Sequence, residues 1–211
     1  MKITIKSEAK GASVLLLSAA NLQANISAEG IPAGFSTFAK AIDFEAKVGQ
    51  SIVIPLVDGT TGVIVGTGEA DVTTMDVRRI GGCIGDTLRK KGLPEASVTL
   101  QMLISLTQRS SLTLESVVQL ISTQISVGNY RYDRYKSKSK SALSSLIIVG
   151  DQGPALNAAI TKGLSLADAR NFARDLVNAP AADIYPASLA EEAISFADDD
   201  ISVEVWGMEK L

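Results

Sequence analysis

The spacing of apolar residues predicts short strands and longer helices in alternation over the first 150 residues. In residues 2–6 apolar and polar side chains alternate strictly, as a half-buried strand requires, and the apolar run 146–149 is typical of a strand buried on both faces. In residues 74–91 apolar side chains recur at helical spacing, and Gly92 and Pro94 then end the helix. Further strands are predicted over 13–18, 51–57, 62–66 and 98–104, and further helices over 36–42 and 114–128.

Strands that alternate with helices of this length are typical of an α/β domain whose sheet is covered on both sides. Asp58-Gly59 lies between two strand-like runs rich in β-branched residues, which favours a hairpin there. We therefore expect residues 1–150 to form a three-layer α/β domain with a mixed sheet between helices.

The last sixty residues have a different character. A helix is predicted from Pro154 to about Asn178, a second helix begins at Pro186, and 201–205 alternates as a strand before another helical start at 207–211. One strand with flanking helices cannot satisfy its own edge hydrogen bonds or bury both faces. The pattern predicts a linking helix over 151–180 and, over 181–211, the beginning of a second, incomplete α/β domain.

The composition excludes several classes of enzyme. The chain has 211 residues, no histidine and one cysteine, so it holds no Ser-His-Asp triad, no His-bearing metal site, no Cys-cluster metal site and no internal disulfide. Twenty basic and 23 acidic residues give a net charge of -3, which argues against a protein that binds nucleic acid over most of its surface.

The N-terminus loosely imitates a secretory signal, because Lys2, Lys6 and Lys10 precede the apolar run 12–20. The strict alternation of 2–6 favours a strand instead. No stretch reaches the roughly 18 apolar residues of a membrane-spanning helix. With a lone thiol, these features predict a cytoplasmic protein with no membrane partner.

Gly62, Gly66 and Gly68 lie at a strand end that precedes a helix, where backbone N–H groups could hold a phosphate. The spacing matches neither the P-loop nor the dinucleotide-binding fingerprint. A tight turn is therefore the favoured interpretation, and phosphate binding is the alternative.

Three other features have a structural and a functional interpretation. Residues 130–140 interleave tyrosines with basic residues, which suits a solvated connection better than nucleic-acid binding. Asp198-Asp199-Asp200 is typical of a turn rather than a cation site, and Asp175 with Asp183 need not be an acid and base pair. Cys83 lies within an apolar stripe and is predicted to be a small buried side chain.

Two segments resemble the leucyl aminopeptidase family, peptidase family M17. The first is Asn129-Tyr130-Arg131-Tyr132-Asp133-Arg134-Tyr135-Lys136, and the second runs from 173 to 190 as ARDLVNAPAADIYPASLA. In the family a similar first segment closes the N-terminal domain and a similar second segment opens the peptidase domain. Residues 62–92, including Arg78-Arg79-Ile80-Gly81-Gly82, also look like the family's N-terminal domain. Asp183 departs mildly from the family pattern, which often has Asn there.

The resemblance implies a macro-domain-like N-terminal domain and a parent protein that releases N-terminal amino acids from peptides. It also implies two divalent metal ions (Mn or Zn), and a hexamer formed as a dimer of trimers. In the family the metal ligands and catalytic residues lie beyond the segment that these 211 residues resemble. We therefore assign no catalytic, metal or ligand-binding residue in this chain and expect no peptidase activity from it alone. The alternative is a freestanding macro-like module that binds a nucleotide or ADP-ribose, with 62–68 as its phosphate site.

Overall fold

The computed structural model describes residues 1–24, 30–69, 71–137, 142–151 and 153–210, and the chain divides into two compact units, Met1–Asn171 and Phe172–Leu211. In the described part of the first unit, one sheet has the strand order β1-β6-β5-β2-β4-β3. Its strands are β1 (Lys2–Lys6), β2 (Ala12–Leu17), β3 (Ser51–Pro55), β4 (Thr61–Gly66), β5 (Glu95–Thr99) and β6 (Ser145–Val149). Only the β3–β4 pair is antiparallel, so the predicted mixed sheet and hairpin are confirmed.

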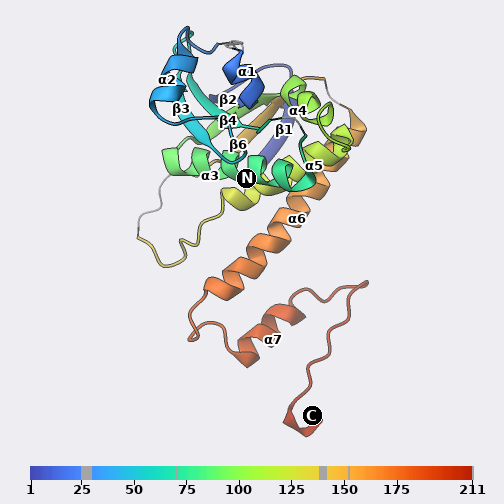
Figure 1. The fold of residues 1–211 in the computed structure, drawn as a ribbon. Helices are drawn as coiled ribbons and strands as arrows, with labels where there is room; N and C mark the ends of the chain where they lie inside the picture. Colours follow the sequence, from blue (N-terminus) through green and yellow to red (C-terminus); the bar gives the residue numbers. More distant parts are fainter. Residues whose placement is uncertain (25–29, 70, 138–141, 152, 211) are drawn as a thin grey trace. The chain divides into compact units, whose positions relative to one another are not determined.

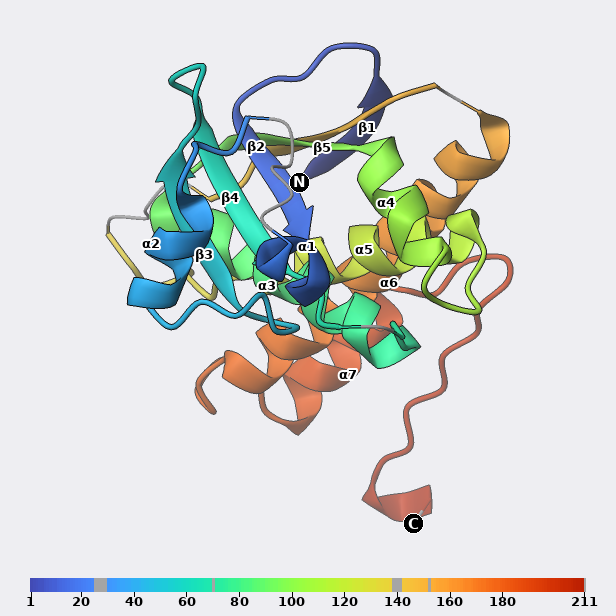
Figure 2. The ribbon, with the colours of Figure 1, turned by 45° about the horizontal axis from the view of Figure 1, so that its top comes forward.

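Helices cover both faces of this sheet (Figures 1 and 2). The helices of the chain are α1 (Ala19–Gln23), α2 (Phe35–Ala41), α3 (Thr74–Lys91), α4 (Leu100–Thr107), α5 (Leu114–Gly128), α6 (Pro154–Asn178) and α7 (Pro186–Ile194), with a 3-10 turn over Met208–Lys210. Alternate residues of each strand point to opposite faces. Val14 and Val98 accordingly join the core beneath α3 and α5, whereas Leu15 and Ile64 join a smaller core beneath α2.

The strand predicted over 98–104 is wrong from residue 100 onward. β5 ends at Thr99, whose hydroxyl accepts a hydrogen bond from the Met102 N–H and so caps the first turn of α4. Leu103 and Leu106 are buried at a helical spacing of three. The apolar and polar alternation through Leu100 and Met102 therefore does not reflect a strand.

The two long helices of the first unit pack with their backbones in contact. A Cβ atom on Gly85 of α3 would lie 2.2 Å from the Ile125 carbonyl oxygen of α5, and one on Gly128 would lie 2.4 Å from the Gly82 carbonyl oxygen. The first half of α6 approaches α5 in the same way, because a Cβ on Gly163 would lie 2.7 Å from the Gln119 carbonyl oxygen of α5. Glycine at these positions therefore sets the spacing between the helices that cover the sheet.

The second unit is small and largely exposed. Phe172 and Phe196 make an edge-to-face contact with centroids 4.9 Å apart, whereas α7 has no fully buried residue. The strand predicted over 201–205 is wrong, because no residue of this segment pairs in a sheet within the described part of the chain. Several large apolar side chains of the unit are exposed, including Val177, Trp206 and Met208. None of the described helices combines the length and apolar character needed to cross a bilayer.

Candidate functional site

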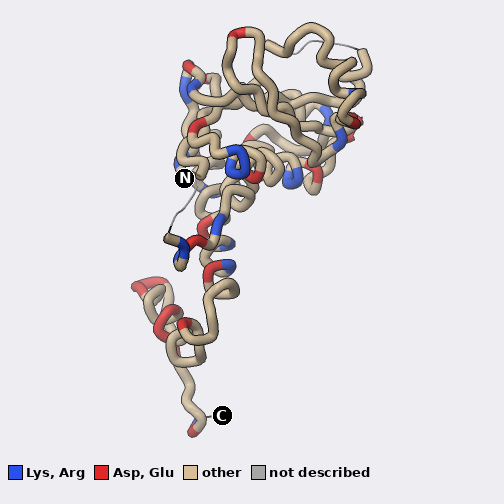
Figure 3. Tube along the Cα trace, turned by 90° about the vertical axis from the view of Figure 1, so that its left-hand side faces the viewer, with Lys and Arg blue, Asp and Glu red and all other residues tan. Residues whose placement is uncertain are grey.

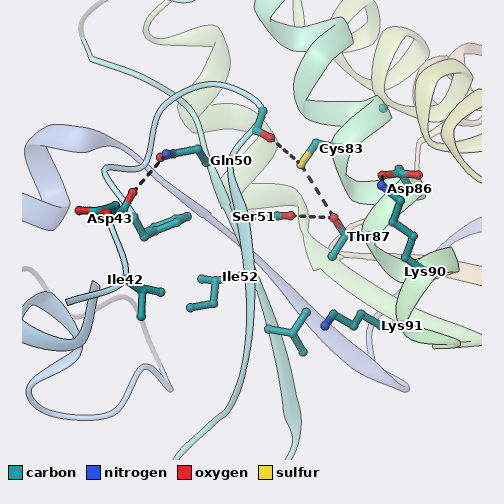
Figure 4. Close-up of a pocket in the computed structure, with 14 residues that line it drawn as sticks. Ile42, Asp43, Gln50, Ser51, Ile52, Cys83, Asp86, Thr87, Lys90 and Lys91 are labelled. Carbon is teal, nitrogen blue, oxygen red and sulfur yellow. Dashed lines mark hydrogen bonds and ion pairs between the residues drawn. The ribbon is translucent and has the colours of Figure 1, made fainter. Parts of the chain in front are cut away.

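An open groove lies along strand β3, at the edge of the sheet, and encloses about 770 Å³. One wall is the second half of α3, and the other is the segment that follows α2 (Figure 4). Its lining combines apolar side chains such as Ile42 and Ile52 with polar and charged ones such as Thr87 and Lys91. No pattern in the sequence signals this groove, because its walls are residues about forty positions apart that only the tertiary fold brings together.

Short side-chain contacts fix β3 against α3 at the start of the groove. The hydroxyls of Ser51 and Thr87 are 2.8 Å apart, and the Cys83 thiol donates to the Gly49 carbonyl oxygen at 3.3 Å (Figure 4). The prediction that Cys83 is buried is wrong, because its side chain is half-buried and lines the groove. Helix α3 places this residue at the margin of the core, where it packs against the core and also contacts the loop before β3.

The loop that leads into β3 is held by the Gln50 side chain. Its amide oxygen accepts hydrogen bonds from the backbone N–H groups of Glu45 and Lys47, both at 3.0 Å, and its amide nitrogen donates to the Asp43 carbonyl oxygen. Asp43 and Ala46 have positive φ angles of 55° and 54°, which non-glycine residues rarely adopt. The Gln50 bonds stabilise this otherwise unfavourable backbone and so shape one end of the groove.

The end of α3 gives the groove a basic wall. Asp86 forms ion pairs with Arg89 and with Lys90, the latter at 2.6 Å. Burial acts to raise the pKa of Asp86, but the hydrogen bonds and charges of Lys90 and Arg89 outweigh it and the pKa is lowered. Lys91 is exposed and pairs with no carboxylate in the described residues, so positive charge remains in excess at this end of the helix.

At Gly62, Gly66 and Gly68 the structure favours the tight turn over the alternative, a phosphate site. The N–H groups of Gly66, Thr67 and Gly68 donate to the carbonyl oxygens of Gln50, Leu17 and Ala46, all at 2.9 Å, so they are not available to an anion. A Cβ on Gly66 would lie 2.3 Å from the Lys47 carbonyl oxygen. Glycine is needed there because the loop before β3 crosses directly over the end of β4.

Arg109 organises the loop that follows β4, a role that the sequence did not reveal. Its guanidinium donates to the Thr67 hydroxyl at 2.9 Å and to the carbonyl oxygens of Gly68 and Glu69. Burial lowers the pKa of Arg109, and the charge of Asp71 partly opposes this effect. An isolated arginine between two helices carries no recognisable motif, so only the structure shows this clamp.

The basic and aromatic segment folds upon itself over 130–137, and residues 138–140 lie outside the described residues. Asp133 pairs with Arg131 at 2.8 Å and with Lys136 at 3.0 Å, and Tyr132 packs edge-to-face with Tyr135. Since the cations described over 131–136 already have partners in the chain, the interpretation as a connecting segment is favoured over nucleic-acid binding. Figure 3 also shows Lys and Arg interspersed with Asp and Glu along the first unit.

The described residues do not fit a pair of divalent metal ions. Within them no three Cys, Asp or Glu side chains lie close enough together to hold one ion. At 198–200 the Asp198 carboxylate accepts from the backbone N–H groups of Asp200 and Ile201, at 2.9 and 2.8 Å, which is a turn as predicted. Asp175 is exposed in the last turn of α6 and Asp183 lies in the turn after it, and neither lines the groove.

Comparison with known proteins decides the family. Residues 15–139, more than half of the chain, match the model of the cytosol aminopeptidase family, N-terminal domain. The chain belongs to the cytosol aminopeptidase family. A probable cytosol aminopeptidase of Solibacter usitatus is 32% identical over 145 residues, which cover 68% of this chain and 28% of the relative. The chloroplastic leucine aminopeptidase A2 of Solanum lycopersicum is 31% identical over 173 residues, which cover 80% of this chain and 30% of the relative.

Solved structures, a leucine aminopeptidase among them, share the fold of this family member. A lysine-to-glutamate variant of tomato leucine aminopeptidase aligns with a TM-score of 0.70 at 22% identity, over 92% of this chain and 41% of that one. The bottromycin maturation enzyme BotP aligns with a TM-score of 0.66 at 22% identity, over 88% of this chain and 36% of BotP. The resemblance to leucyl aminopeptidases is thus confirmed. The chain spans about a third of the length of the curated relatives that it matches.

Proposed function

We propose that this chain is the N-terminal portion of a metal-dependent leucyl aminopeptidase that removes N-terminal amino acids from peptides. The observation that carries the proposal is the family match over residues 15–139, which falls within the first compact unit. The names of the relatives, cytosol and leucine aminopeptidases, support the peptide substrate class. In this proposal residues 1–150 are the N-terminal domain, 151–180 the linking helix and 181–211 the start of the peptidase domain.

We also propose that the chemistry belongs to parts of the parent protein other than this chain. The two divalent ions, Mn or Zn, would polarise the scissile carbonyl and supply a hydroxide nucleophile, a chemistry that needs a cluster of anionic ligands. Since the described residues lack such a cluster, the 211-residue chain alone is expected to be inactive. Its parent would act in the cytoplasm, as the names of several relatives suggest, although other relatives are chloroplastic.

In the parent the first unit would contribute to a hexamer built as a dimer of trimers. A chimera tests this role. Residues 1–171 would replace the corresponding domain of tomato leucine aminopeptidase, and light scattering and leucine-p-nitroanilide turnover with Mn²⁺ would be measured beside the parent and a version that lacks the domain. We expect the chimera to match the parent in size and to retain turnover. The proposal would be refuted by a chimera that has a folded circular-dichroism spectrum but matches the version lacking the domain in its size and its turnover.

A further inference from the structure

Strand β3 presents one row of backbone groups to solvent. Hydrogen bonds from Gly66 N–H to the Gln50 carbonyl and from Leu56 N–H to the Thr60 carbonyl fix which residues of this segment bond to β4. In an antiparallel pair bonded and non-bonded residues alternate, so the even-numbered residues 50–56 face β4. The N–H and C=O groups of the odd-numbered residues 51 and 53, and the C=O of 55, therefore point away from the sheet.

Nothing in the described residues pairs with this outer row. Ser51 and Val53 make no backbone hydrogen bond on that side, and the third outward position is Pro55, which lacks an N–H. Proline is tolerated there because only the outer edge loses a donor. The opposite edge differs, since β1 carries Lys2 and Lys6 at its ends, whereas β3 has no charged residue. Monomeric proteins often protect an edge with charges or proline, and Pro55 protects only the end of β3. The outward backbone groups of residues 51 and 53 therefore remain open to a partner strand.

The two walls of the groove differ in chemistry. Ser51 and Val53 point toward α3, and Ile52 points to the opposite face with Ile54. A strand added about 4.8 Å beyond β3 would place alternate side chains against each wall. One row would meet the end of α3, where Lys91 is left over after Asp86 pairs with Lys90, and the other row would meet Ile42 and Ile52 (Figure 4). Asp43, which follows Ile42, also lines the groove.

We propose that this groove binds an extended peptide segment as an additional strand on β3, one in which acidic and apolar residues alternate. The acidic row would complement Lys91, which pairs with no carboxylate in the described residues, whereas Lys90 is already paired with Asp86. The apolar row would cover Ile42, which is 44% exposed. Backbone bonds to an edge supply affinity in this mode of recognition, and the alternate side chains supply specificity.

A second copy of the chain fits the groove poorly. Two β3 strands paired antiparallel about Val53 would be related by a two-fold axis. Thr87 lies beside Ser51, so Lys91, one helical turn later, lies near the level of Val53. The basic ends of the two α3 helices would then meet across the axis, and like charges repel. The charge of the groove therefore favours a different, acidic strand. This inference does not depend on the proposed aminopeptidase function.

A fluorescein-labelled peptide with the sequence Glu-Val-Glu-Val-Glu-Val, blocked at both ends, tests the site on the 211-residue chain. Anisotropy should show saturable binding, which weakens when lysine replaces glutamate in the peptide and is lost when alternate backbone nitrogens are methylated. The chain contains one cysteine, Cys83, and it lines the groove, so saturating peptide should also slow its alkylation by iodoacetamide at least about threefold.

Charge variants provide the matched control. Lys91→Glu should weaken binding about two- to fivefold, the effect of one exposed ion pair, whereas Lys2→Glu on the opposite edge should leave binding unchanged. Val53→Pro should abolish binding by removing an outward N–H, with thermal melting to verify its fold. Three results would overturn the proposal: no saturation below about 1 mM peptide, equal binding of the lysine peptide, or protection of Cys83 by self-association in the absence of peptide.

Discussion

Glycine at the crossing of α3 and α5 allows a sharp test of the packing, because two positions on one helix should respond in opposite directions. Gly85 faces the backbone of α5, and a Cβ atom added to it would lie only 2.2 Å from the Ile125 carbonyl oxygen, whereas a Cβ on Gly82 would meet no heavy atom within 4 Å. The oxygen belongs to a helical backbone and cannot rotate away. Gly85→Ala must therefore push α3 and α5 apart, and the buried neighbours Ile84 and Ile121 lose contact.

The expected magnitudes follow from two opposing effects. Overpacking costs about 3 kcal/mol at a rigid contact of this kind, and alanine regains about 1 kcal/mol of helix propensity. Gly85→Ala should therefore lower the free energy of unfolding by about 2 kcal/mol. Gly82→Ala has only the favourable effect and should raise it by about 0.5–1 kcal/mol.

Urea unfolding followed by far-UV circular dichroism would measure both variants beside the original chain. In thermal melts the Gly85 variant should lose about 4–8 °C and the Gly82 variant should gain about 1–4 °C. If both substitutions changed stability in the same direction, the backbone contact between α3 and α5 would not be the feature that requires glycine.

Three further variants test other parts of the first unit. Ser122→Ala should raise the free energy of unfolding by about 1 kcal/mol, because its buried hydroxyl has no hydrogen-bond partner among the described residues; a loss in urea melts would contradict this. Hydrogen bonds from Thr73 lower the pKa of Asp76 in the folded chain. The Asp76 carboxylate therefore stabilises the fold above its unfolded pKa of about 3.9. This contribution is lost as the pH falls through the folded pKa of Asp76. Asp76→Asn should thus unfold more easily at pH 7, with the difference from the original chain closing in acid; a pH-independent difference would refute the carboxylate's role. Arg109→Met should expose the loop after β4 to limited proteolysis, because three of its acceptors lose their donor, and unchanged cleavage would show that the clamp is dispensable.

Local signals explain which elements the sequence predicted well. The bounds of α3 are correct because Thr73 forms a capping box with Asp76 and Gly92 ends the helix in the left-handed conformation. The alternation of β1 is equally local and equally correct. The errors arose where alternation was read without its surroundings. Thr99 begins a helix in the middle of one alternating run, and residues 201–205 alternate without a partner strand in the described chain.

The candidate site was harder to predict because its chemistry is non-local. The groove depends on Ser51 and Thr87 meeting across 36 positions, and the Arg109 clamp reaches back 42 positions to Thr67. Gly66 illustrates the same limit, because the local pattern left an anion site open as an alternative to the favoured tight turn, and only the tertiary fold shows that backbone carbonyl groups already accept from these N–H groups. The family resemblance came from long segments near 130 and 180, whose order along the chain needs no structure to recognise.

The most direct test of the account is the hydrolysis of leucine-p-nitroanilide by the purified 211-residue chain, with Mn²⁺ or Zn²⁺ titrated in and a full-length leucine aminopeptidase as the positive control. We expect p-nitroaniline release no faster than in buffer with the same metal, because the described residues offer no cluster of carboxylates to bind the ions. Metal-dependent turnover that coelutes with the chain through repeated chromatography would contradict the claim that this part of an aminopeptidase lacks the catalytic apparatus.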